Sequence, residues 1–454
     1  MSTFTRENHG RPAAPVRIVH MGLGNFTRAH QAYYTENAPD AAEWGIAAFT
    51  GRRPDQARAL APQDGLYTLI VRGSEGTSYE VISAISRAHT SDDAEALRGY
   101  FASPELAILT STVTEAGYMR AADGSLDSGN ADVAADIEAL RADPLAEVST
   151  FPGKVVAGLL ARRAAGAGAM TILPCDNLPE NGPAVRRVVT DLAAAVDQGL
   201  PGWIDENVSF ATCMVDRITP ATTDEDRSEV AREMGYDDAS PVPTEAFSEW
   251  VVAGDFPAGR PRWEDAGVAI VEDVTPFEER KLWMLNGSHS LLAYAATIRG
   301  FETVGEAIMD PEVRGWVNEW WDVAGEHLEV ESEEYRAALL DRFENPNIRH
   351  LLAQIAADGS QKIPVRIVPA LREEIAAGRV PDGPIRAIAA WVQHLRGHGA
   401  PVKDAQEDLV KGLVGSDLDE TIGNVLEFLG EDLAANTEVV DRVKALALEL
   451  VPEE

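Results

Sequence analysis

The fold is decided by the stretch Val16-Arg-Ile-Val-His-Met-Gly22-Leu-Gly24-Asn-Phe26-Thr-Arg28-Ala-His30. A short apolar run here enters a glycine-rich turn, and a helical pattern then continues to about Ala38. Glycines at such a turn let the backbone approach the pyrophosphate of a dinucleotide, which then lies at the start of the helix. Thr27 replaces the third glycine of the G-x-G-x-x-G pattern. The prediction of a dinucleotide site therefore depends on the place of this unit as the first strand and helix of the chain.

The next segments predict a mostly parallel sheet with helices on both faces, because strand-like and helical patterns alternate. The strand-like runs are near residues 45–50, 106–112 and 169–174, and the helical ones near 92–102, 131–142 and 153–165. Two further β-rich runs, 66–72 and 78–86, flank Gly73-Ser-Glu-Gly76 and predict a hairpin. After a polar, Asp-rich stretch, strands are predicted around 246–252 and 267–272.

A second informative stretch is Thr275-Pro-Phe-Glu-Glu-Arg-Lys-Leu-Trp-Met-Leu-Asn-Gly-Ser-His289. Thr275 before Pro276, with Glu278 three residues after the threonine, predicts a helix that begins at Pro276. The apolar residues of this helix point in nearly every direction, which is typical of a buried helix. At 100° per residue, four polar side chains lie on less than half of the helix circumference: Glu278, Lys281, Asn286 and His289.

An amine, an amide and an imidazole on one buried wall can bind and deprotonate a hydroxyl group. Burial lowers the pKa of a lysine by disfavouring its charged form, so Lys281 can act as a base near neutral pH. In the alternative, Lys281 pairs with Glu278 on a half-exposed helix, and the amide and imidazole satisfy backbone groups. Clustering on one wall leaves both interpretations open.

The length and the helical patterns indicate two domains, because 454 residues exceed what one core usually holds. From residue 276 onward the pattern is almost wholly helical, near 303–328, 332–343, 346–357, 384–397, 405–414, 419–429 and 437–450. We therefore expect a dinucleotide-binding domain over 14–274 and a mainly helical, substrate-binding and catalytic domain over 275–454. Lys281 falls at this boundary, where ligand clefts tend to form.

Charge and composition exclude several classes of protein. Lys+Arg 39 against Asp+Glu 74 gives a net charge of −35, which repels nucleic acid and anionic membrane surfaces. No run reaches the roughly 18 apolar residues of a membrane span, and we expect a cytoplasmic protein. The two cysteines, Cys175 and Cys213, are too few for a disulfide framework or a Cys-rich zinc site. We expect both to be reduced, and no metal.

Three predicted strands end in polar residues that can contact ligands. The second strand runs into Gly51-Arg52-Arg53, where many NAD-binding folds carry an acid for the ribose 2′-hydroxyl. The arginines can bind the 2′-phosphate of NADP or be solvated loop charges, so we expect NAD or NADP, with NAD slightly preferred. At two other strand ends, Asn177 or Asp216 can each reach a substrate or simply cap the following turn.

Together these residues resemble the mannitol dehydrogenase family, the polyol-specific long-chain dehydrogenases. The resemblance runs from about Val16 into the C-terminal helices. It rests on the glycine turn, Gln63-Asp-Gly-Leu-Tyr-Thr-Leu69, Leu173-Pro-Cys-Asp-Asn-Leu-Pro-x-Asn181-Gly, Val215-Asp-Arg-Ile-Thr-Pro220 and Lys281-x-x-x-Leu-Asn-Gly-x-His289-Ser. It implies a zinc-independent NAD(P)-dependent enzyme. It also implies an α/β fold, with a Rossmann-type doubly wound sheet domain followed by a mainly α-helical C-terminal domain.

The resemblance also implies residue roles. Lys281 matches the family's catalytic base, and Asn177 and Asn286 match two amides that stabilise the oxyanion. Glu278 matches an acid that relays the proton towards solvent. Substrate-binding positions are matched by His289, Asp216 and Lys362, and coenzyme-binding positions by Gly22, Gly24, Asn25, Phe26 and Arg28.

The implied reaction interconverts a polyol and a ketose, and we expect D-mannitol and D-fructose. One departure is Gln354, which stands where mannitol 2-dehydrogenases are expected to carry an arginine. The alternatives are a fructuronate or tagaturonate reductase, a mannitol-1-phosphate 5-dehydrogenase and an arabinitol dehydrogenase. An anionic substrate requires a further cation, which Arg366 or Arg372 can supply.

A nucleotide or sugar sensor on the same fold is the non-enzymatic alternative. A sensor would be expected to lose its base or its oxyanion amides, but Lys281, Asn177 and Asn286 are all present. We therefore favour an enzyme with a small-molecule substrate, as a monomer or a small homo-oligomer.

Overall fold

The computed structural model describes residues 4–452. Internal contacts divide the chain into two compact units, Met1–Val274 and Thr275–Glu454. Within the described residues, no helix combines the length and the apolar character that crossing a bilayer requires. Cys175 and Cys213 are both buried and form no disulfide.

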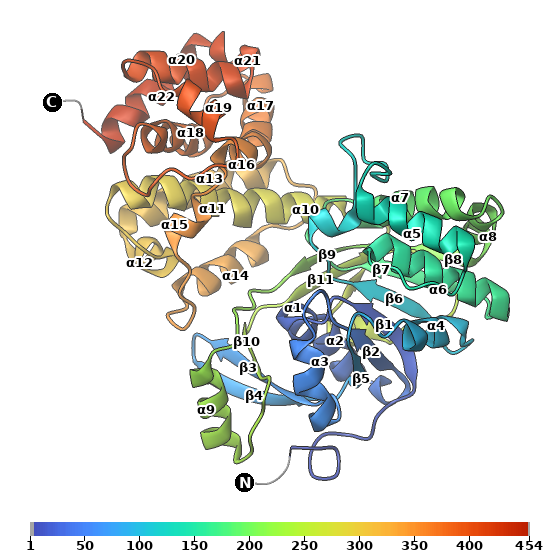
Figure 1. Ribbon diagram of the computed structural model, residues 1–454. Coiled ribbons are helices and arrows are strands. Elements are labelled where there is room, and N and C mark those ends of the chain that lie inside the picture. The colour runs from blue at the N-terminus through green and yellow to red at the C-terminus, as the bar shows by residue number, and fades with distance from the viewer. Residues whose placement is uncertain (1–3, 453–454) are drawn as a thin grey trace. The chain divides into compact units, whose positions relative to one another are not determined.

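The first unit is built on a six-stranded sheet in the order β5-β2-β1-β6-β7-β8, in which all neighbouring strands are parallel (Figure 1). This is the strand order of a doubly wound Rossmann-type sheet, in which ligands bind beyond the carboxyl ends of the strands at the point where the order reverses. That point lies between β1 and β6, where Met21 pairs with Ser111. The strands are β1 (Val16–Met21), β2 (Gly45–Phe49), β5 (Ile85–His89), β6 (Ile108–Ser111), β7 (Met170–Pro174) and β8 (Val208–Phe210).

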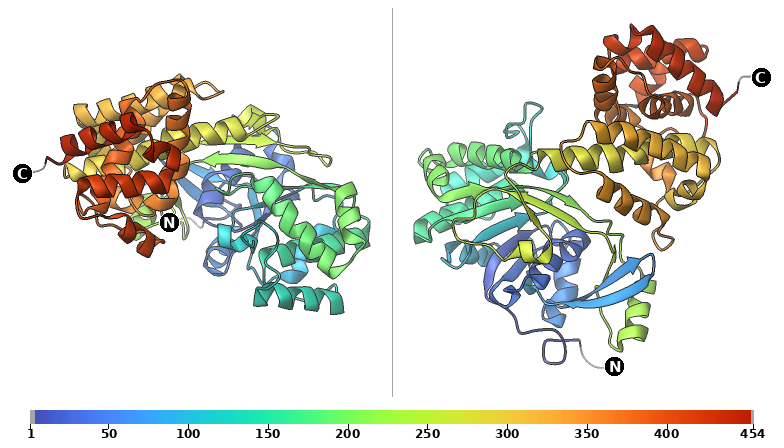
Figure 2. Two further views of the ribbon diagram at one scale, coloured as in Figure 1. Left: turned by 90° about the horizontal axis from the view of Figure 1, so that it is seen from above. Right: turned by 180° about the vertical axis from the view of Figure 1, so that it is seen from behind.

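The two faces of this sheet have separate cores, because successive strand residues point to opposite faces. Val19 and Met21 face one core with helices α4 (Ala94–Ala102), α5 (Ala131–Ala142), α6 (Phe151–Ala165), α7 (Asn181–Val196) and α8 (Leu200–Asn207), which gather on one side of the sheet in Figure 2. Ile18 faces the other core with α1 (Asn25–Ala29), α2 (Gln31–Asn37), α3 (Asp55–Leu60) and Trp250 of β11 (Glu249–Ala253). The predicted doubly wound α/β architecture is confirmed.

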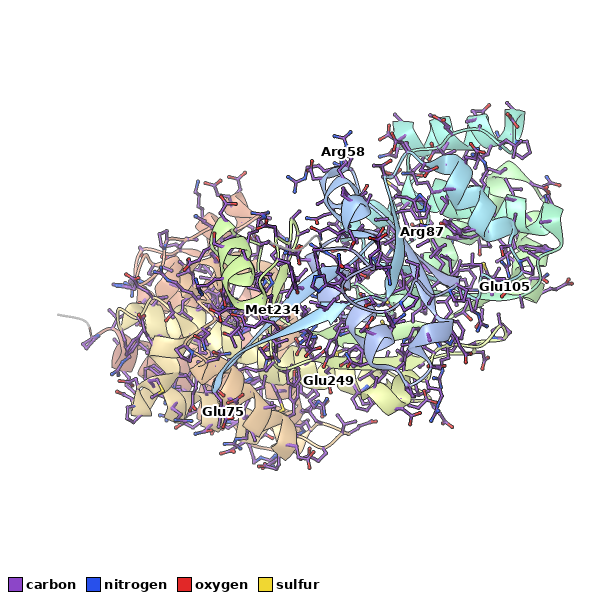
Figure 3. The ribbon with its side chains drawn as sticks, turned by 90° about the horizontal axis from the view of Figure 1, so that it is seen from below. Arg58, Glu75, Arg87, Glu105, Met234 and Glu249 are labelled. Atoms are coloured by element: carbon purple, nitrogen blue, oxygen red, sulfur yellow. The ribbon has the colours of Figure 1, made fainter. Side chains whose placement is uncertain are left out.

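Two three-stranded sheets complete the first unit. One has the order β10-β3-β4 and the other β12-β11-β9. Glu75 marks the turn of the predicted β3–β4 hairpin (Figure 3). The strand predicted over 78–86 is two strands, because the chain leaves the hairpin after Ile82 and β5 joins the main sheet. The remaining elements are β3 (Tyr67–Gly73), β4 (Gly76–Ile82), β9 (Thr212–Asp216), α9 (Asp224–Met234), β10 (Val242–Glu245), β11 (Glu249–Ala253) and β12 (Ala269–Ile270).

The second unit is helical, as predicted. Its centre is α18 (Asp382–Leu395), which is buried from Gly383 to Leu395 and packs against α13 and α22. The other helices are α10 (Thr275–Arg280), α11 (Ser288–Leu291), α12 (Val304–Met309), α13 (Pro311–Glu326), α14 (Glu333–Glu344), α15 (Leu352–Ile355), α16 (Gly359–Arg366), α17 (Val368–Ala376), α19 (Glu407–Leu413), α20 (Leu418–Leu429), α21 (Glu431–Ala434) and α22 (Thr437–Leu450).

The helix predicted from Pro276 is not a continuous α-helix. After α10 the chain forms a π-helix over Lys281–Gly287, then α11, then a second π-helix over Leu292–Ala296. Two indoles of α13 support the first π-helix: Trp320 and Trp321 donate hydrogen bonds to the carbonyls of residues 283 and 284, at 2.8 and 3.0 Å. Gly287 permits this approach, because an added Cβ would lie 2.8 Å from the Trp320 ring.

Candidate active site

The glycine turn after β1 is packed against the ends of β2 and β6. The backbone N–H groups of Gly22 and Leu23 both donate to the Phe49 carbonyl, at 2.9 and 2.8 Å. Gly22 has φ +110°, and an added Cβ would lie 2.2 Å from the carbonyl oxygen of Thr112. A residue with a side chain is therefore excluded at position 22 by backbone conformation and by space.

Gly24 leaves room for a ligand. Its backbone is extended, with φ −137° and ψ −167°, a conformation open to any residue. Among residues 4–452, apart from its chain neighbours, an added Cβ there would meet one atom within 4 Å, the Gly22 carbonyl oxygen at 3.7 Å. Together with Gly22 and Asn25, this residue lines a cavity of about 620 Å³, within the size range of small-molecule sites. The turn therefore fits a group that approaches its backbone closely, such as a pyrophosphate.

Asn25 and Arg28 hold this turn in place. Asn25 donates to the Pro220 carbonyl at 2.9 Å, and its side-chain oxygen accepts a hydrogen bond from Arg28 at 2.7 Å. The Arg28 guanidinium is fully buried and also donates to the Gly24 and Ser240 carbonyls. Arg28 thus makes its hydrogen bonds within the protein, and it positions the turn. Phe26 stacks on His30, with ring centroids 4.9 Å apart.

The second strand ends at the same cavity. Arg52 and Arg53 line it together with the glycine turn. They also line an adjoining cavity of about 870 Å³, together with Thr112 and Lys154. The carboxyl ends of β1, β2 and β6 therefore share one hollow region of the first unit, as expected at the switch point of a doubly wound sheet.

The ends of β7 and β9 are joined by a buried asparagine. The side chain of Asn181 donates to the carbonyls of Cys213 and Asp176, at 2.9 and 3.2 Å, and its oxygen accepts from the Cys213 N–H at 3.1 Å. Asn177 follows β7 and is exposed, and Asp216 ends β9 and is buried. Asn181 thus brings together the two strand ends that carry these predicted site residues.

A half-buried carboxyl group, that of Asp176, stands beside Asn177. Burial raises the pKa of Asp176 to about 6, although the Tyr118 hydroxyl donates a hydrogen bond of 2.5 Å to it. The folded state therefore holds a proton that the unfolded chain loses near its ordinary pKa of 3.8. The stability gained from this proton is complete below about pH 4 and is lost as the pH rises through 6.

We expect Asp176→Asn to remove this pH dependence. The wild type should lose about 2 kcal/mol relative to the variant between pH 4.5 and 7.5, since one pKa unit corresponds to about 1.4 kcal/mol and part of the effect lies below pH 4.5. Urea denaturation of both proteins at the two pH values measures this difference in the free energy of unfolding. Asp197→Asn is the control, because its ion pair with Arg163 lowers the pKa of Asp197 and keeps this carboxylate charged throughout. If the free energy of unfolding changes with pH in the same way in the wild type and in Asp176→Asn, the raised pKa of Asp176 is contradicted.

In the second unit, three predicted site residues share the segment that begins with the π-helix. Lys281 and Asn286 are five residues apart, and hydrogen bonds of a π-helix join residues i and i+5. The two side chains therefore leave the helix on one side, closer together than the α-helical spacing predicted. Both are half-buried, as is Glu278 on α10, and His289 on α11 is buried.

Positive charge surrounds His289. Burial lowers the pKa of His289 well below 6.5, and the charges of four neighbours lower it further: His350, Arg342, Arg366 and Lys362. The imidazole is therefore neutral near pH 7, with one nitrogen as donor and the other as acceptor. Its Nε2 atom is buried and has no hydrogen-bond partner within residues 4–452. This nitrogen is suited to a ligand hydroxyl.

Lys362 and Arg366 on α16 lie beside this group. Lys362 donates to the carbonyls of Ile355 and Ala357, at 3.0 and 2.6 Å, and an ammonium group has three donors. Arg366 donates to the Asn286 carbonyl and to the Ser290 hydroxyl, both at 3.2 Å. It thereby fixes the backbone that carries the Asn286 amide.

Of the two arginines proposed as a further cation, only Arg366 is near His289. Arg372 is bound to Asp432 at 2.9 Å, and both side chains are half-exposed. Because the charge of Arg372 is already paired with this carboxylate, the structure favours Arg366 of the two alternatives. Gln354 is exposed on α15.

Sequence reasoning missed Arg342 and His350. The His350 ring stands edge-on to His289, with centroids 4.9 Å apart. Both residues are more than 50 positions from His289 in the sequence, and no motif there points to them. Within residues 4–452, no group of three or more His, Cys, Asp or Glu could hold a metal ion.

In a comparison with known proteins, two family models together match most of the chain. The family model described as "Mannitol dehydrogenase Rossmann domain" matches residues 16–265, and "Mannitol dehydrogenase C-terminal domain" matches 273–451. D-mannonate oxidoreductase of Escherichia coli (strain K12) is 36% identical over 444 residues, covering 95% of this chain and 87% of its own. Mannitol 2-dehydrogenase of Cereibacter sphaeroides is 36% identical over 410 residues, covering 87% and 84%. The structure of Pseudomonas fluorescens mannitol 2-dehydrogenase in a ternary complex with NAD and D-mannitol matches with a TM-score of 0.75 and 35% identity, over 97% of this chain and 92% of that one.

Proposed function

Because the chain belongs to the mannitol dehydrogenase family, we propose that it oxidises a secondary alcohol of an acyclic polyol to a ketone, reversibly and with a nicotinamide coenzyme. D-mannitol and D-fructose are the proposed substrate pair. The observation that carries this proposal is the set of polar side chains, Lys281, Asn286 and His289, within a mostly apolar helical segment of the second unit. Mannitol 2-dehydrogenases of comparable length support it.

In this mechanism Lys281, as the neutral amine, removes the proton from the hydroxyl that is oxidised. The amides of Asn177 and Asn286 donate hydrogen bonds to the oxygen as negative charge develops on it. Glu278, on the turn before Lys281, passes the proton on towards solvent. His289, Asp216 and Lys362 bind the other hydroxyl groups of the sugar chain. The bound coenzyme supplies the acceptor for the hydride, and Gly22, Gly24 and Asn25 would hold it.

The positive charge around His289 favours a second candidate, a sugar acid. An anion beside Arg342, Lys362 and Arg366 would be stabilised by all three cations. The likeness to a D-mannonate oxidoreductase supports a substrate of this kind, because mannonate carries a carboxylate. The second candidate is therefore the interconversion of D-mannonate and D-fructuronate by the same chemistry.

Initial rates separate the two candidates. We expect turnover of D-mannitol and D-fructose under the first proposal, and of D-mannonate and D-fructuronate under the second. Each sugar is assayed at equal concentration with NAD(H) and with NADP(H), in the oxidative and the reductive direction. Xylitol and D-arabinitol serve as shorter polyol controls. If no compound of this panel is turned over with either coenzyme, both candidates are wrong.

A further inference from the structure

We propose that the coenzyme site prefers NADP(H) to NAD(H), and that Arg52 and Arg53 select it by binding the 2′-phosphate of the adenosine ribose. This inference rests on the proposed nicotinamide-dependent function and concerns the first unit alone. It is carried by the place of the two arginines, by their lack of partners and by the absence of an acid at the end of β2.

The two arginines stand where a doubly wound sheet binds the adenosine ribose. They follow β2, the strand next to β1, and the Phe49 carbonyl at the end of β2 accepts two hydrogen bonds from the glycine turn. In this fold the end of the second strand carries the group that reads the ribose 2′ position. Arg52 and Arg53 line both cavities at this end of the sheet.

Neither arginine is bound to another part of the protein. Both side chains are exposed, and within residues 4–452 neither has a hydrogen bond or an ion pair with another residue. Other arginines of this chain of net charge −35, such as Arg72, Arg141 and Arg163, each bind a carboxylate. Two adjacent cations repel each other, and an anion between them removes this repulsion.

The chemistry of the 2′-phosphate matches this arrangement. NADP carries a phosphate dianion that NAD lacks, and the planar guanidinium group binds phosphate through two parallel hydrogen bonds. The segment between β2 and α3 reads Thr50-Gly-Arg-Arg-Pro54, with no carboxylate for a ribose hydroxyl. The acid that lines the first cavity is Asp55, exposed at the first position of α3, and its role as a ribose ligand is the competing interpretation.

Coenzyme binding without sugar tests the inference independently of any substrate. The full-length protein is titrated with NADPH and NADH, followed by nicotinamide fluorescence, and with the competing probes 2′,5′-ADP and 5′-AMP. We expect the Kd of NADPH to be lower than that of NADH by about tenfold or more, since hydrogen bonds to charged groups are among the strongest. The double variant Arg52→Ala/Arg53→Ala should raise the Kd of NADPH about 10- to 100-fold and change that of NADH about twofold or less.

Two single variants are the matched controls. Arg58→Ala removes the same charge five residues further on, from an exposed side chain that projects outward from α3 in Figure 3, and should leave both Kd values unchanged. Asp55→Ala should not weaken NADH binding. The inference is overturned if NADH binds as tightly as NADPH, if the double variant weakens both coenzymes equally, or if Asp55→Ala selectively weakens NADH. Retained NADPH preference in a protein that turns over none of the sugars would support this inference and contradict the proposed function.

Discussion

Replacing Lys281 with alanine lowers kcat for alcohol oxidation at pH 7 on the order of 10²- to 10⁴-fold, the usual contribution of a positioned general base. Without the amine, the hydroxyl proton has no acceptor held beside it, and hydride cannot leave before the oxygen gains negative charge. Binding of the coenzyme should not change, because the glycine turn that would hold it belongs to the first unit. Steady-state rates and coenzyme titrations on the same preparation measure both effects.

Two further variants separate a missing base from a missing charge. Lys281→Arg keeps a cation at this position, but a guanidinium group stays protonated and cannot serve as the base. We expect it to be as inactive as the alanine variant. Lys411→Ala removes an exposed amine on α19 that is paired with Glu407, and it should retain full activity. Wild-type turnover by Lys281→Ala would refute the assigned base.

Changing Asn286 to aspartate lowers kcat on the order of 10²- to 10³-fold, as the loss of one oxyanion donor does in other enzymes. The two side chains have the same shape, so the cavity and the helix are preserved. The carboxylate, however, accepts hydrogen bonds and places negative charge where the reaction creates more. Because Arg366 holds the backbone carbonyl of residue 286 at 3.2 Å, the new group cannot easily move away.

The effect should fall on the rate constant and not on coenzyme affinity. Alcohol oxidation and ketone reduction should both slow, because the two directions pass through the same charged transition state. Asn318→Asp is the matched control: Asn318 lies on α13 of the same unit, and its side-chain oxygen accepts from Arg336 at 2.9 Å, as a carboxylate oxygen also can. Equal kcat values for Asn286→Asp and Asn318→Asp would remove Asn286 from the proposed mechanism.

The sequence predicts elements well where one periodicity dominates. The helix predicted over 131–142 has those bounds in the structure, and Val16–Met21 is the central strand β1. Failures occur where two elements share one pattern. The run 78–86 is β-rich throughout, so its division between two sheets is a matter of tertiary pairing. The helix predicted over 303–328 breaks at Asp310, which caps α13 before Pro311, a helix-start signal that is visible in hindsight.

Within the candidate site, the functional groups were easier to predict from the sequence than the positions of their side chains. The polar residues of the 281–289 segment stand out because their neighbours are apolar. A π-helix cannot be distinguished from an α-helix by that pattern, so the predicted angle between Lys281 and Asn286 was too large. The cations around His289 come from α14 and α16, and only folding brings them together. Sequence alone could not tell Arg366, beside Asn286, from Arg372, bound to Asp432.

The wide coil over Lys281–Gly287 also limits how this segment tolerates changes in length. Deleting one residue between Lys281 and Asn286 would let the ordinary α-helical ladder close, and the residues that follow would keep nearly their present direction, because the narrower turn offsets the lost residue. Deleting a second residue has no such offset and would rotate His289 and Ser290 by about 100°, although every functional group was still present in the polypeptide. The first deletion should therefore be tolerated far better than the second. Relatives of this chain can be compared in this region only when the number of residues per turn is considered together with their identity.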